Sequence, residues 1–137
     1  MGKLRDEAVR RLTAAGDEDL QVAGLCLQAE PMACRAAAFH AQQAAEKYIK
    51  ALLTFLGLPF SKTQDLAELL FLLPQDSSVS AAVGDLSELS DAAVVVRYPG
   101  DMWDFDRAVA EELADKARTV KSAILSELSA KGYRQDR

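Results

Sequence analysis

Helix-breaking residues are scarce in this chain of 137 residues, which contains only seven glycines and four prolines. Aromatic residues make up 7%, and β-branched residues gather in a single short run, at positions 94–96. The remainder is dominated by Ala, Leu, Glu, Lys and Gln, which favour helices. The composition therefore predicts an all-α fold, and the length is that of one domain that buries a real core.

Long hydrophobic runs are also missing, since no apolar stretch approaches the ~20 residues that a membrane-spanning helix needs. The first residues, MGKLRDEAVRR, lack the apolar centre of a signal peptide. We therefore expect a cytoplasmic protein without membrane contact. Cys26 and Cys34 match no zinc or redox spacing and are expected to be buried, reduced thiols, with a disulfide between them as the alternative.

Histidine occurs once, at His40, and no carboxylate or cysteine lies at ligand spacing from it. A lone histidine of this kind is a poor metal site, so neither a metal nor another cofactor is predicted. Its simplest role is that of a boundary side chain between an apolar and a polar helix face. A place in a ligand pocket or a dimer interface is the functional alternative.

Positive charge is also in short supply, because the net charge is -5 and the isoelectric point is near 4.9. This excludes a general nucleic-acid binder, which needs a basic surface for phosphate contacts. The charge is uneven, however. Residues 31–63 carry four cations against Glu46 alone, a net charge of +3 that leaves -8 for the remainder. This segment fits a small anionic ligand or an RNA end.

Hydrophobic periodicity predicts a bundle of five helices in an up-and-down-like order, spanning residues 3–30, 31–56, 65–73, 78–97 and 105–130. Gly16 is a candidate interruption of the first helix, with Asp17 as the cap of a restarted one. Pro31 suits the first position of the second helix. Asp104 is the expected cap of the last helix, and residues 131–137 form a frayed tail of the single domain.

The second predicted helix has one broad apolar face and one polar face. The apolar side is rich in alanine and comprises Ala41, Ala44, Ala45, Tyr48, Ile49, Ala51, Leu52, Phe55 and Leu56. A polar stripe runs down the helix and comprises His40, Gln43, Glu46, Lys47 and Lys50. Glu46 and Lys50 have the i, i+4 spacing that supports a surface helix by about 0.3–0.5 kcal/mol. In the functional alternative, both lysines line an anion-binding groove with Gln43.

Four segments together resemble the HEPN domain family. They are Asp19-Leu20, the string HAQQAAEKYIKALL at residues 40–53, KTQDL at 62–66 and Arg97-Tyr98-Pro99. The resemblance covers residues 15–130 and implies a helical bundle that is commonly homodimeric and often encoded beside a minimal nucleotidyltransferase. It also implies that some relatives are metal-independent RNases, which use an Arg and, after four to six intervening residues, a His near the end of the fourth helix.

The chain departs from that RNase pattern. Arg97 stands at the expected position, but Met102, Trp103 and Asp104 occupy the places where the histidine falls. Gln64 also stands where many relatives of this subgroup carry histidine. Imidazole moves protons near neutral pH, whereas an amide does not titrate. The spacing of Arg35 and His40 matches the motif but lies in the wrong helix, so no catalytic residue is predicted.

The preferred hypothesis is a nucleotide- or RNA-binding HEPN protein without RNase activity, which partners a minimal nucleotidyltransferase in a toxin–antitoxin-like module. The binding candidates are Arg97, Tyr98, Lys47, Lys50, Gln43 and His40. A guanidinium beside an aromatic ring suits a phosphate and a base. In the structural interpretation, the Arg97 side chain instead binds carbonyl groups of the last helical turn, and Tyr98 packs against the protein. One alternative is an RNase that uses Arg97 with Tyr98 or His40 as a substitute acid or base. Another is a purely structural homodimerisation module that buries the alanine-rich face.

Overall fold

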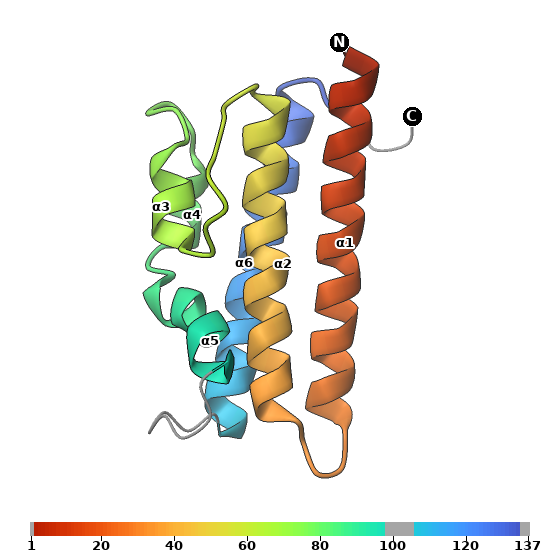
Figure 1. The fold of residues 1–137 in the computed structure, drawn as a ribbon, viewed down its shortest axis with the longest axis vertical. Coiled ribbons are helices and arrows are strands. Elements are labelled where there is room, and N and C mark those ends of the chain that lie inside the picture. Colours follow the sequence, from red (N-terminus) through yellow and green to blue (C-terminus); the bar gives the residue numbers. More distant parts are fainter. Residues whose placement is uncertain (1, 98–105, 135–137) are drawn as a thin grey trace.

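The computed structural model describes residues 2–97 and 106–134, and for residues 94–97 it describes the backbone alone. These ranges contain six α-helices and no strand (Figure 1). The helices are α1 (Gly2–Gln28), α2 (Cys34–Phe55), α3 (Leu66–Phe71), α4 (Val79–Val83), α5 (Ser87–Arg97) and α6 (Arg107–Ala130). The all-α prediction is confirmed. No described helix has the length and apolarity needed to cross a membrane.

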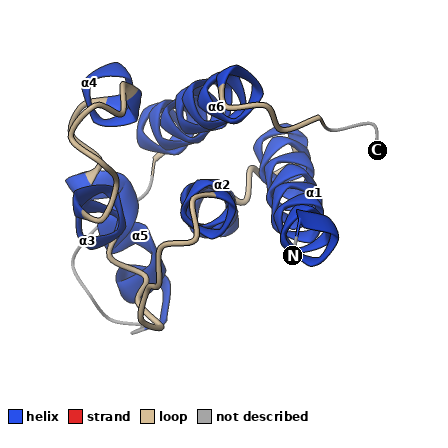
Figure 2. Cartoon of the chain, turned by 90° about the horizontal axis from the view of Figure 1, so that it is seen from above, coloured by secondary structure: helices blue, strands red, loops and turns tan. Residues whose placement is uncertain are grey.

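Helix α2 stands at the centre of the bundle. Viewed along the helices, α1 lies on one side of it, α3 and α5 lie on the opposite side, and α6 covers a third (Figure 2). Helices α1 and α2 run antiparallel, and the Ala33 N–H closes their connection by donating to the Cys26 carbonyl at 3.0 Å. Because a central helix is buried on several faces, its neighbouring helices determine which groups its polar side chains contact.

Small side chains let the neighbouring helices approach α2 closely. Six alanines of α2 are fully buried: Ala37, Ala38, Ala41, Ala44, Ala45 and Ala51. They share the core with Tyr48, Ile49 and Leu52 and with the stripe of α6 that includes Leu113, Val120 and Ile124. The predicted apolar face of the second helix is therefore confirmed. Because this alanine-rich surface is already covered within one chain, it is not free to pack against a second copy.

Gly16 does not interrupt α1. Its backbone lies against the Tyr48 ring, and a Cβ at this position would come within 2.9 Å of two ring carbons. Asp17 is therefore not the cap of a restarted helix, as was expected. Its carboxylate instead accepts a hydrogen bond from the Tyr48 hydroxyl at 2.5 Å and pairs with Lys121 at 2.9 Å. The glycine serves close packing between α1 and α2.

The prediction of a single helix at 78–97 is wrong, because this segment forms two helices, α4 and α5. Gly84 separates α4 from α5 with φ +67° and ψ −151°, a conformation outside the helical region. Asp85 follows it and accepts a hydrogen bond from the Ser87 N–H at 2.9 Å, which starts α5. The break turns the expected five helices into six.

Two predicted helix starts also differ from the structure. Helix α2 begins at Cys34, so Pro31 lies in the connecting loop rather than at the first helical position. Helix α6 is capped by Asp106, whose carboxylate accepts from the Val109 N–H at 2.9 Å. The predicted cap, Asp104, lies outside the described residues.

The chain remains packed beyond α6. The ring of Tyr133 is buried and meets the Phe55 ring edge-on at a centroid distance of 5.9 Å. Residues 131–134 therefore belong to the fold rather than to a frayed tail, and residues 135–137 lie outside the described part. Cys26 and Cys34 are free thiols and half-buried, so the disulfide alternative does not apply here.

Candidate functional site

The polar stripe of α2 separates into two groups that face different neighbours. The first group, which we call the Asp19 cluster, comprises Asp19, His40 and Lys47. Asp19 is 8% exposed, and its carboxylate receives Lys47 Nζ at 2.5 Å and contacts His40 Nδ1 at 2.9 Å. The lysine and the histidine are therefore held against α1 by a mostly buried acid. Neither Lys47 nor His40 is therefore unpaired, as the predicted anion-binding groove requires.

Asp19 was missing from the residues predicted for the site, although a signal for it exists in the sequence. It shares one face of α1 with the buried residues Val9, Thr13, Gly16 and Ala23, at steps of three or four. A carboxylate on such a face needs a cationic or hydrogen-bonding partner, because burial of an unpaired charge is costly. That reasoning points to a basic stripe on the neighbouring helix.

The second group lies on the side of α2 that faces α3 and α5. Lys50 Nζ pairs with Glu46 at 2.9 Å, and the two side chains are 15% and 11% exposed. Fully buried Gln42 donates to the Gln64 carbonyl at 2.9 Å. Gln43 is half-buried and donates to the Gln42 side-chain oxygen at 2.7 Å. The Glu46–Lys50 pair is therefore largely covered rather than a surface support.

A shallow pocket of about 460 Å³ opens beside this second group. We call it the Lys50 pocket; it is lined by Glu46, Lys50, Lys62, Thr63 and Gln64. Lys50 Nζ also lies 5.5 Å from the centre of the Phe60 ring. Two ammonium groups face one carboxylate here, so the lining carries a net positive charge in an acidic protein.

The local structure before α3 holds this pocket wall in place. Asp65 caps α3 by accepting from the Ala67 and Glu68 N–H groups at 3.0 and 3.3 Å. Thr63 accepts from the Asp65 N–H and donates to Glu68, each at 3.1 Å. These hydrogen bonds fix the segment that carries Lys62, Thr63 and Gln64.

The backbone of Arg97 and the side chain of Lys47 lie at different heights of the bundle. Ser90 and Gln42 both donate to the Gln64 carbonyl, so these two residues lie at one level. Helix α5 runs antiparallel to α2 (Figure 1). With a rise of 1.5 Å per residue, Arg97 lies roughly 10 Å beyond Ser90, whereas Lys47 lies roughly 7 Å from Gln42 in the opposite direction. The Arg97 side chain and Tyr98 lie outside the described part.

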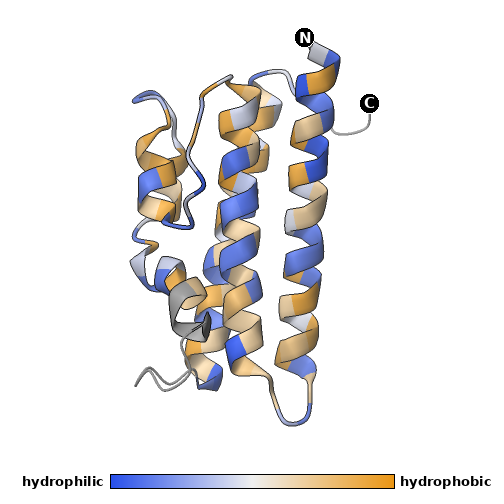
Figure 3. Cartoon of the chain, in the orientation of Figure 1, coloured by the Kyte–Doolittle hydropathy of each residue, from blue (hydrophilic) through white to orange (hydrophobic). Residues whose placement is uncertain are grey.

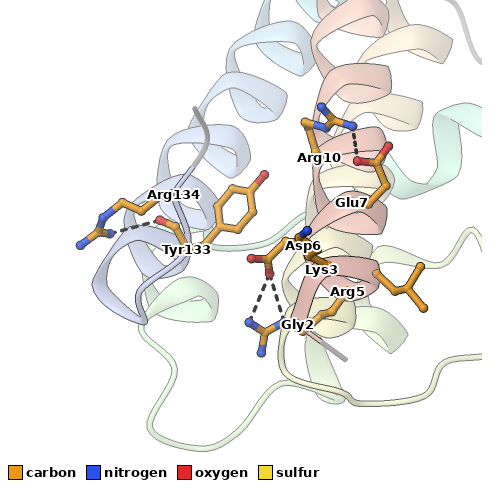
Figure 4. Close-up of a pocket in the computed structure, with 9 residues that line it drawn as sticks. Gly2, Lys3, Arg5, Asp6, Glu7, Arg10, Tyr133 and Arg134 are labelled. Atoms are coloured by element: carbon orange, nitrogen blue, oxygen red, sulfur yellow. Dashed lines mark hydrogen bonds and ion pairs between the residues drawn. The ribbon is translucent and has the colours of Figure 1, made fainter. Parts of the chain in front are cut away.

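A second hollow, of about 630 Å³, lies where the start of α1 meets the end of the described chain (Figure 4). Its lining includes Arg5, Arg10, Tyr133 and Arg134. The Arg10 side chain pairs with Glu7, and Arg134 donates to main-chain carbonyls. Arg5 stacks on the Phe55 ring with its guanidinium carbon 4.1 Å from the ring centre. These three cations stabilise the end of the bundle.

Metal ligands do not converge in the described residues, where no group of three or more His, Cys, Asp or Glu side chains is placed to hold a metal ion. The Asp19 cluster contains a single carboxylate and one imidazole.

A sequence profile of the HEPN domain matches residues 9–128, which is most of the chain. The chain belongs to the HEPN domain family. Neither a curated protein nor a solved structure matches it. The assignment agrees with the all-helical fold and supports a nucleotide- or RNA-related function at the level of the family.

In this HEPN domain the only histidine lies far from the helix that carries Arg97. His40 contacts Asp19 on α1, whereas α5 lies on the opposite side of α2 (Figure 2). Within one chain the His40 side chain therefore faces α1 rather than the backbone of α5.

Proposed function

We propose that this HEPN domain binds a nucleotide or an RNA end without cleaving it, and that it partners a minimal nucleotidyltransferase in a toxin–antitoxin-like module. The observation that carries the binding proposal is the Lys50 pocket. It joins two ammonium groups to the polar side chains of Thr63 and Gln64, with the Phe60 ring nearby. Ammonium groups suit phosphates, and an aromatic ring suits a base.

Lys62 is the cation of this pocket that is best placed to meet a ligand. It is exposed, and it forms no ion pair with any residue of the described ranges. Lys50, by contrast, is bound to Glu46. A phosphate that approaches the pocket meets Lys62 first and then shares Lys50 with Glu46. Arg97 and Tyr98 remain predicted contributors to the same function.

The binding proposal is tested by thermal-shift titration with ATP and with a single-stranded RNA octamer. A ligand that binds only the native state raises the unfolding free energy by about 2.7 kcal/mol at 100 times its Kd. We expect the melting temperature to rise with ligand concentration, and Lys62→Glu to weaken that rise. The matched control is Lys131→Glu, which makes the same charge change at an exposed residue at the end of α6.

The binding proposal fails if neither ligand shifts the wild-type melting temperature. It also fails if Lys131→Glu and Lys62→Glu reduce the shift equally, because the effect is then one of net charge. Gel analysis of RNA incubated with the wild type tests the absence of cleavage. Cleavage by the wild type that disappears in Arg97→Ala would favour the RNase alternative.

The proposed protein partner is tested separately. Sedimentation of the purified chain, alone and mixed with a minimal nucleotidyltransferase encoded beside it, measures both self-association and the mixed complex. We expect a homodimer in the first case and a heteromeric complex in the second. A monomer that does not bind the nucleotidyltransferase contradicts both parts of this proposal.

A further inference from the structure

Helix α3 exposes two large apolar side chains at its C-terminal end. Within this short helix Leu66 and Leu69 are buried, but Phe71 is 88% exposed and the adjoining Leu72 is 38% exposed. The end of α3 is accordingly coloured as hydrophobic on the outside of the bundle (Figure 3). A phenylalanine beside a leucine, both open to water, suits the apolar centre of a docking surface.

Negative charge dominates the segment of the chain that contains this apolar pair. Between residues 57 and 96 the chain carries six acids and a single cation, Lys62, and all seven are exposed. We call the six acids the acidic face: Asp65, Glu68, Asp76, Asp85, Glu88 and Asp91. None of them forms an ion pair with another residue of the described ranges. Among the described residues, Lys116 approaches Asp85 through its main-chain carbonyl at 3.1 Å, and the other five acids of the face have no cationic partner.

Within the acidic face, two acids flank the apolar pair closely along the chain. Glu68 precedes Phe71 by three residues and Leu72 by four, so it lies one turn away on the same side of α3. Asp76 follows in the loop after α3. An occupant of this surface must therefore bury apolar contacts on Phe71 and Leu72 and present cations on either side of them.

We propose that Phe71, Leu72 and the acidic face dock a basic amphipathic helix of a partner protein. An amphipathic helix places apolar side chains at steps of three and four and carries lysines or arginines beside them, which matches both parts of the surface. At Phe71 and Leu72 the neighbouring carboxylates, which form no ion pair within the described residues, disfavour nucleic acid and an anionic membrane as the occupant. The proposal is independent of the Lys50 pocket and concerns a different chemistry.

A second copy of the chain is the competing occupant. Near the start of α1, Leu4 is 80% exposed between Lys3 and Arg5, so the chain carries a short basic and apolar segment of its own. Arg5, however, already pairs with Asp6 and stacks on Phe55. We therefore assign the surface to a foreign helix, and the experiment separates the two cases.

The probe is a fluorescein-labelled helical peptide of fourteen leucines and lysines in an amphipathic order, titrated with the full chain by fluorescence anisotropy. The double variant Phe71→Ser/Leu72→Ser is expected to weaken binding by at least about tenfold, as removal of apolar anchors does. The matched control is Leu4→Ser/Leu25→Ser, which removes two exposed leucines from α1. It is expected to bind as the wild type does. Circular dichroism melts check that both variants fold.

A second pair of variants tests how far peptide binding depends on the negative charge of the acidic face. Glu68→Gln/Asp76→Asn, which keeps an oxygen acceptor for Thr63, is expected to weaken binding, whereas Glu111→Gln/Glu112→Gln, with the same charge change on the exposed side of α6, is expected to keep it. A peptide with glutamates in place of the lysines should not bind. Equal losses in both members of either pair overturn the proposal. So does concentration-dependent self-association that Phe71→Ser/Leu72→Ser abolishes, because the occupant is then a second copy.

Discussion

At the scale of single residues, the contact between Gly16 and Tyr48 is the tightest constraint on α1. A Cβ at Gly16 would meet two ring carbons of Tyr48 at 2.9 Å. The ring is fully buried, so it cannot swing away. We expect Gly16→Ala to lower the unfolding free energy by about 1–3 kcal/mol, as overpacking does. Urea unfolding followed by circular dichroism measures the change.

Gly24 provides the control for this substitution, since it lies in the same helix and nothing would lie within 4 Å of its added Cβ. Gly24→Ala is expected to stabilise the protein by about 0.5–1 kcal/mol, because alanine favours a helix interior. Opposite signs at two glycines of one helix would isolate the packing effect. Stabilisation by both substitutions contradicts the tight contact with Tyr48.

The Asp19 carboxylate links α1 to α2 by charge. Asp19→Asn leaves Lys47 and His40 without their anionic partner in a half-buried environment. We expect a loss of about 1.5–3 kcal/mol in unfolding free energy, the range for hydrogen bonds to charged groups. Asp115→Asn is the control, because the Asp115–Arg118 pair is exposed and such pairs contribute about 0–1 kcal/mol. Equal losses in urea unfolding contradict a special role for Asp19.

The hydroxyl of Tyr48 makes stability depend on pH at the alkaline end. Burial, with the neighbouring Asp17 carboxylate, raises the pKa of Tyr48 above its usual range. In the unfolded chain a tyrosine titrates at about pH 10. The folded state holds the proton more tightly, so this stabilisation is complete below pH 10 and declines as pH rises above it. We expect urea midpoints to fall between pH 9 and 11, and to fall less in Tyr48→Phe.

At the scale of elements, Gly84 decides that α4 and α5 are separate helices. Its φ of +67° with ψ of −151° is a conformation that only glycine adopts readily. We expect Gly84→Ala to lower the unfolding free energy by about 1–3 kcal/mol. Nothing lies within 4 Å of an added Cβ there, so backbone strain alone is measured. A neutral result in urea unfolding contradicts the assigned backbone conformation.

The elements themselves were largely predictable from the sequence. Apolar residues at steps of three and four identified the long helices, and the inward face of α2 was predicted correctly. The break at Gly84 was not, because Val79 and Val83 continue in helical register into Leu86 and Leu89 and mask the turn. A glycine within a helical pattern does not reveal its φ, as the opposite outcomes at Gly16 and Gly84 show.

The candidate site was less predictable than the fold. The stripe on α2 was correctly identified as polar, but its partners depend on which helices surround α2, and periodicity within one helix does not contain that information. Lys47 binds α1, whereas Lys50 borders the Lys50 pocket. The anion-binding role of residues 31–63 stays a prediction from the charge pattern, whereas the proximity of Lys62 to Lys50 follows only from the tertiary arrangement.

At the scale of the whole molecule, packing is uneven. Helices α1, α2 and α6 are long and share the main core, while α3 has six residues and α4 has five. Short helices with exposed sides open more readily than the core. We expect amide hydrogens of α3 and α4 to exchange fastest among the helices, and those of α2 slowest. Uniform exchange across the helices, measured by mass spectrometry, contradicts this expectation.

The position of α6 has a consequence for how the protein is made. Helices α1 and α2 are neighbours in the chain and pack together, so this hairpin is able to form while later residues are still being added. Helix α6 also covers α2, but it is the last of the six helices to be synthesised. A growing chain therefore carries α2 with one apolar side open to solvent until α6 is complete. Chaperones that recognise exposed apolar segments have their main opportunity during that interval.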